Sequence, residues 1–134
     1  MSSGTHHFLD KQSISFPKTI DENAYSSVVD LIEKSCEKFA ERPAFSSFGQ
    51  VLSYAEIERK SAYVAAYLQA ELGLKKGDRV ALMSPNIMAF PVAMLGILRA
   101  GLVQVNVNPL YTGRELTHQL NDADTDTIII YGGV

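Results

Sequence analysis

The sequence predicts an α/β fold in which amino-terminal helices and a short hairpin precede half of a doubly wound parallel sheet (β-α-β-α-β). Three short apolar segments, rich in β-branched residues, predict the strands of that sheet: 79–83, 102–107 and 127–131. Between consecutive segments lies one stretch with helical periodicity. Strands joined through single helices run parallel, with right-handed crossovers. This order of elements is typical of the α/β class.

Composition and charge limit the classes of function. The chain has 134 residues, of which 46% are hydrophobic and 20% charged, so it can bury a core of ordinary size. We expect an irregular arm over residues 1–24, which have no sustained period, and a folded region over 25–134. A net charge of -3 with no basic face argues against a nucleic-acid partner. A single cysteine, Cys36, and no apolar leader over residues 1–18 predict a cytoplasmic protein.

The first helix is predicted from apolar residues that recur at helical spacing between Val28 and Ala40. Ser27 with Asp30 marks its start, and Arg42-Pro43 its end. A hairpin follows over residues 44–52. Its turn is Phe48-Gly49, where the glycine supplies the positive φ that a tight turn requires.

The second helix begins at Ser53-x-x-Glu56, a capping box in which each side chain satisfies a backbone N–H of the other residue. Its inward stripe consists of Ile57, Val64, Ala65, Leu68 and Leu72.

The third helix is predicted to begin at Ser84-Pro85, with a serine cap and proline at the first helical position. Pro91 predicts a kink or a later start. Gly101 ends the helix in the left-handed conformation.

After the strand at 102–107, Asn108-Pro109 predicts a turn, and Thr112-x-x-Glu115 is a second capping box. It begins a fourth helix with Leu116 and Leu120 inward. The last strand, 127–131, is expected to leave an unpaired sheet edge. An open edge can recruit a strand of a second copy, which makes a homodimer a possible assembly.

The common catalytic signatures are absent from the sequence. No G-x-G-x-x-G, P-loop or G-x-S-x-G motif occurs. His118 is expected on a helix surface, and the alternating Asp122, Asp124 and Asp126 in a solvated turn, because the glycine and distant glutamate of a calcium loop are missing. We therefore assign no catalytic, cofactor-binding or metal-binding residue.

Leu52-Ser53-Tyr54-Ala55-Glu56-Ile57 resembles the first core motif of the adenylate-forming superfamily, L-[ST]-Y-x-E-[LI], at all five specified positions. Leu98-Arg99-Ala100-Gly101, followed by a strand ending at Asn108, resembles its second core motif. Residues 77–82 and 108–116 resemble the acyl and aryl CoA-ligase branch, and residues 106–112 and 118–122 look most like bacterial long-chain fatty acid-CoA ligases.

The resemblance implies that this is the amino-terminal part of an AMP-forming ligase. Such an enzyme joins a fatty acid to coenzyme A through an acyl-adenylate, using ATP and Mg. The phosphate loop, the motif ending in T-E, the ribose-binding aspartate and the carboxy-terminal lysine of the family do not occur before Val134. The resemblance thus implies a partial domain over 25–134 that is inactive alone and needs no cofactor itself. Its partner would be the remainder of the enzyme, which could contact the inner membrane peripherally.

Each matched residue also has a structural explanation, as a cap, a helix end or a turn. We therefore expect a structural motif consisting of Ser53, Tyr54, Glu56, Gly101, Asn108, Pro109, Tyr111, Thr112 and Glu115. Two other interpretations remain open at this point, a self-associating interaction module and a stand-alone flavodoxin-like regulatory domain.

Overall fold

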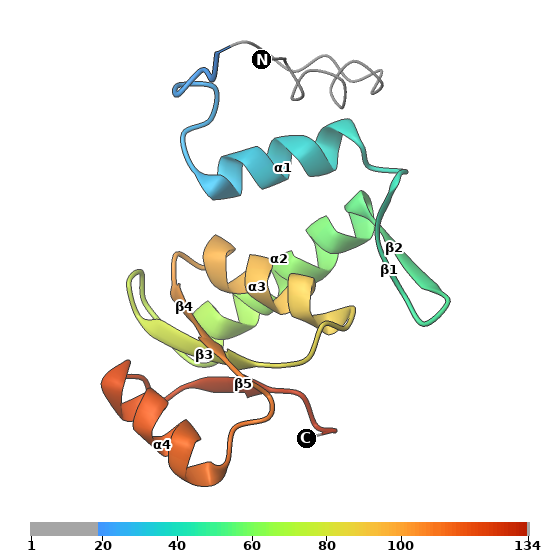
Figure 1. Ribbon diagram of the computed structural model, residues 1–134. Coiled ribbons are helices and arrows are strands. Elements are labelled where there is room, and N and C mark those ends of the chain that lie inside the picture. Colours follow the sequence, from blue (N-terminus) through green and yellow to red (C-terminus); the bar gives the residue numbers. More distant parts are fainter. Residues whose placement is uncertain (1–18, 134) are drawn as a thin grey trace, which may run out of the picture.

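The computed structural model describes residues 19–133 (Figure 1). The predicted arm over 1–24 falls mostly outside this range, and residues 19–24 contain no helix or strand. The elements in chain order are α1 (Val28–Lys38), β1 (Pro43–Ser47), β2 (Gln50–Ser53), α2 (Tyr54–Ala70), β3 (Arg79–Met83), α3 (Ala89–Arg99), β4 (Val103–Val107), α4 (Gly113–Asp122) and β5 (Ile128–Ile130).

The main sheet is parallel and three-stranded, with the order β4-β3-β5. Ala81 in the central strand aligns with Val105 on one side and Ile128 on the other. α2 and α3 cover one face of the sheet and α4 covers the other (Figure 1). This confirms the predicted half of a doubly wound sheet, and it places β5 at an edge of the sheet.

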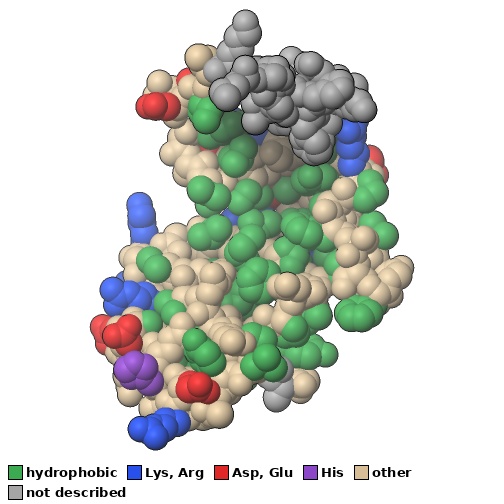
Figure 2. Space-filling view, viewed as in Figure 1, with side chains coloured by type: hydrophobic (Ala, Val, Ile, Leu, Met, Phe, Trp, Pro, Cys, Tyr) green, Lys and Arg blue, Asp and Glu red, His purple; other side chains and the backbone are tan. Residues whose placement is uncertain are grey.

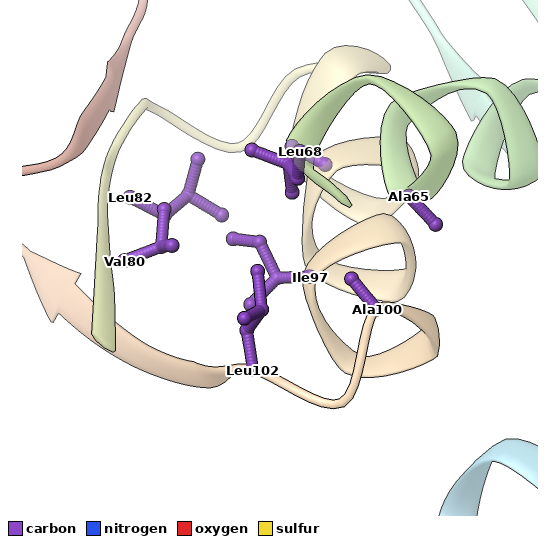
Figure 3. Close-up of a cluster of buried hydrophobic side chains, with 8 residues drawn as sticks. Ala65, Leu68, Val80, Leu82, Ile97, Ala100 and Leu102 are labelled. Atoms are coloured by element: carbon purple, nitrogen blue, oxygen red, sulfur yellow. The ribbon is translucent and has the colours of Figure 1, made fainter. Parts of the chain in front are cut away.

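The core follows the alternation of side chains along β3. Val80 and Leu82 point toward α2 and α3, where they meet Leu68 and Ile97 (Figure 3). Ala81 and Met83 point toward α4 on the opposite face. A separate cluster joins α1 to the rest of the fold, made of Cys36, Leu52, Ile57 and Leu95.

The hairpin of β1 and β2 closes through a two-residue turn. Phe48 has a φ of 49° and Gly49 a φ of 78°, and Ser47 aligns with Gln50 across the turn. Positive φ at both central positions matches the right-handed twist of the flanking strands. The predicted hairpin and turn are confirmed.

Two predicted helix boundaries are wrong. α3 begins at Ala89 instead of Ser84-Pro85, because the Ser84 hydroxyl donates to the carbonyl of Pro85 and caps no helix. Pro91 falls in the first turn, where its missing N–H costs nothing, so the later start is confirmed. α1 ends at Lys38, since Phe39 to Arg42 form a turn before β1.

Leu72 does not belong to the inward stripe of α2. It lies beyond the end of the helix and is 46% exposed. β5 is also shorter than the predicted 127–131. Over residues 19–133, no helix combines the length and apolar character that crossing a bilayer requires.

Candidate functional site

The residues of the predicted structural motif are called the signature residues below. Their first group, Ser53, Tyr54 and Glu56, lies where the hairpin enters α2. The backbone N–H of Glu56 donates to Ser53 Oγ (3.2 Å), and the N–H of Ser53 donates to Glu56 Oε2 (2.9 Å). The N–H of Tyr54 donates to the carbonyl of Arg42 (3.1 Å), which fixes the hairpin base to the helix. The hydrogen bond from the Ser53 backbone lowers the pKa of Glu56. The predicted capping box is present.

The second group lies at the carboxyl end of β4. Asn108 forms the turn, because its side-chain oxygen accepts from the N–H of Leu110 (3.0 Å) and its carbonyl accepts from the N–H of Tyr111 (3.1 Å). Glu115 Oε2 then accepts from both the N–H (2.8 Å) and the hydroxyl (2.7 Å) of Thr112. These bonds lower the pKa of Glu115 and complete the second capping box.

Gly101 lies at the other end of β4. Its φ is 76°, and its carbonyl accepts from the N–H of Gly77 (2.9 Å). A Cβ at this position would lie 3.3 Å from Lys76 Cγ. Gly101 and Asn108 therefore flank opposite ends of one strand, and the signature residues do not converge on a single site.

The structure instead gathers a polar cluster around Arg99, which is the last residue of α3. Arg99 Nη2 donates to Glu58 Oε1 (2.7 Å) and also lies 3.2 Å from Glu33 Oε1. Arg99 Nη1 donates to the carbonyl of Glu58 (3.2 Å) and to Ser61 Oγ (3.3 Å). Nη1 also contacts Glu58 Oε2 at 2.6 Å, although the alignment falls short of a hydrogen bond. One guanidinium thus joins α1, α2 and α3.

This cluster has the chemistry of a structural clamp. The side chain of Arg99 is only 15% exposed, and its hydrogen bonds with Glu58 raise its pKa, so it stays charged and occupied. Burial, followed by the charge of Glu58, raises the pKa of the neighbouring Cys36, which keeps this residue a thiol. Sequence reasoning missed the cluster; the available signal was a lone arginine that ends the long apolar run of residues 87–98.

The carboxylates, the histidine and the helix N-termini of the described residues are the places where a metal ion or a phosphate could be held. Within 19–133 no group of three His, Cys, Asp or Glu side chains could hold a metal ion. Phosphates often bind at helix N-termini. At the N-termini of α2 and α4, the hydroxyls of Ser53 and Thr112 each accept one backbone N–H, from Glu56 and from Glu115. The first turn of α3 contains Pro91, which has no N–H to offer.

The model of the AMP-binding enzyme family matches residues 32–132, most of the chain. This chain belongs to the AMP-binding enzyme family. That membership confirms the resemblance read from the two core motifs, and it explains why residues from separate parts of the fold match one signature.

Close relatives within the family are bacterial ligases. The long-chain-fatty-acid--CoA ligase of Escherichia coli O6:H1 is 51% identical over 123 residues, which is 92% of this chain and 22% of that protein. The enzyme of the same name from Haemophilus influenzae is 49% identical over 113 residues, 84% of this chain and 20% of the relative. The chain therefore spans about a fifth of the length of these relatives and matches their amino-terminal region.

Solved structures of the family share the fold. The N-terminal subdomain of Klebsiella oxytoca NpsA, in complex with 3-hydroxyanthranilyl-AMSN, is 27% identical with a TM-score of 0.74, and the match covers 78% of this chain and 26% of that subdomain. A benzoate CoA ligase from Burkholderia xenovorans is 28% identical with a TM-score of 0.73, covering 78% of this chain and 21% of the ligase. The architecture in Figure 1 is thus that of adenylate-forming enzymes.

Proposed function

We propose that the chain is the amino-terminal part of an AMP-forming long-chain fatty acid-CoA ligase and provides the half-sheet on which the rest of that enzyme is built. The observation that carries this proposal is the 51% identity over 92% of the chain to ligases of that name. In the complete enzyme, fatty acid and ATP would give acyl-adenylate and pyrophosphate, and coenzyme A would then displace AMP.

The contacts of the described residues favour a structural role for this chain in the ligase reaction. Phosphoryl and acyl transfer need positioned cations and backbone donors that face the developing charge. Here Arg99 is enclosed by Glu33, Glu58 and Ser61, and the signature residues form caps and turns. We therefore propose that ATP, Mg and coenzyme A bind to parts of the ligase outside this chain, and that the chain alone has no activity.

A chimera tests the proposal directly. This chain would replace the matching region of the Escherichia coli ligase, and fatty-acid-dependent ATP–pyrophosphate exchange and acyl-CoA formation would be measured. We expect both activities in the chimera, and neither in the 134-residue chain alone. A folded chimera without activity, or exchange catalysed by the chain alone, would contradict the proposal.

We further propose that the complete ligase is a cytoplasmic protein that contacts the inner membrane peripherally. The single cysteine suits a reducing compartment, and relatives carry names that specify long-chain fatty acids as substrates. Fractionation of cells that express the chimera tests the location. Recovery of the chimera in the periplasm would contradict it.

A further inference from the structure

We draw no further inference here: the strongest candidate, the apolar surface around the groove between β1 and the start of α3 (Figure 2), lies on a chain that spans about a fifth of the length of its relatives, and nothing in the structure shows what covers it.

Discussion

The two faces of the parallel sheet are covered in different ways. On the α2 and α3 face, eight buried side chains from both helices, from β3 and from the connection between α3 and β4 form one cluster. On the α4 face only three are buried, all from the sheet, and α4 itself, which is described in full, contributes none. Leu116 and Leu120 of α4 are only partly buried against that face. The first face is held by core packing, whereas α4 depends more on its capping box.

This difference predicts how each face responds to damage. Full burial of an aliphatic side chain contributes about 1.5–3 kcal/mol, so the α2 and α3 cluster should determine global stability. An element with few buried contacts opens locally at lower free energy. We therefore expect α4 to fray before the α2 and α3 face unfolds.

The largest effect is expected where α3 crosses α2. A Cβ on Gly96 would lie 2.5 Å from Val64 Cβ, and the carbonyl of Ser61 would be 3.1 Å away. Gly96→Ala should therefore force the helices apart and lower the free energy of unfolding by about 3 kcal/mol, as measured by urea denaturation.

Gly113→Ala on α4 is the matched control for Gly96. Nothing lies within 4 Å of the added Cβ there, so the change should be neutral or stabilising by up to about 1 kcal/mol. Equal losses at the two glycines would contradict the contrast between the faces.

The clamp around Arg99 should give the next largest effect. Arg99→Met leaves the carboxylates of Glu33 and Glu58 without their cation, but both are partly exposed and regain water. We expect a loss of about 2 kcal/mol in the free energy of unfolding, less than for a fully buried pair. Arg114→Met, at an exposed position of α4, should change stability by less than about 0.5 kcal/mol. A similar loss in both variants would show that the clamp contributes nothing specific.

The two capping boxes allow a matched comparison of α2 and α4. Ser53→Ala and Thr112→Ala each remove a side-chain acceptor, and each should cost about 1 kcal/mol. For Ser53 the loss should lower the global melting temperature, since α2 is part of the main core. For Thr112 it should increase amide hydrogen exchange within α4 while the melting temperature changes little. A lower melting temperature for Thr112→Ala together with an unchanged one for Ser53→Ala would contradict this expectation.

The smallest effect concerns pH. The pKa values of Glu56 and Glu115 lie below their ordinary value of 4.5, because backbone N–H groups donate to the ionised carboxylates. Each carboxylate therefore stabilises the fold above pH 4.5, and this contribution is lost as the pH falls through the lowered pKa. The urea midpoint should fall less steeply below pH 4.5 in the Glu56→Gln/Glu115→Gln variant than in the original chain. If the urea midpoints of the two proteins fall in parallel with pH, the two capping boxes do not contribute to the loss of stability below pH 4.5.

Local signals in the sequence predicted much of the fold. The boxes at Ser53 and Thr112, the turn at Gly49 and the helix end at Gly101 each depend on residues close in the chain, and all four are present. Local signals gave a wrong prediction for the start of α3. Ser84-Pro85 has the composition of a helix start, but Met88 packs against the α1 cluster and the helix begins only after it.

Long-range partners explain what the sequence could not reveal. Glu58 lies 41 residues from Arg99 along the chain, and no local pattern joins them. Likewise, the close approach of Gly96 to Val64 follows from the crossing of two helices. The family motifs could be recognised in the sequence because their residues form caps and turns, whose hydrogen-bond partners lie close in the chain. Its residues do not converge, because they support different parts of one scaffold.

The central claim is that these signature residues hold the fold while the chemistry of the ligase lies outside this chain. The most direct test is fatty-acid-dependent ATP–pyrophosphate exchange in the chimeric ligase carrying Ser53→Ala and Thr112→Ala, measured where circular dichroism shows the protein folded. We predict a lower melting temperature with an exchange rate per folded molecule within about twofold of the unmodified chimera. A loss of about 100-fold at an unchanged melting temperature would contradict the claim and give these residues a role in the reaction.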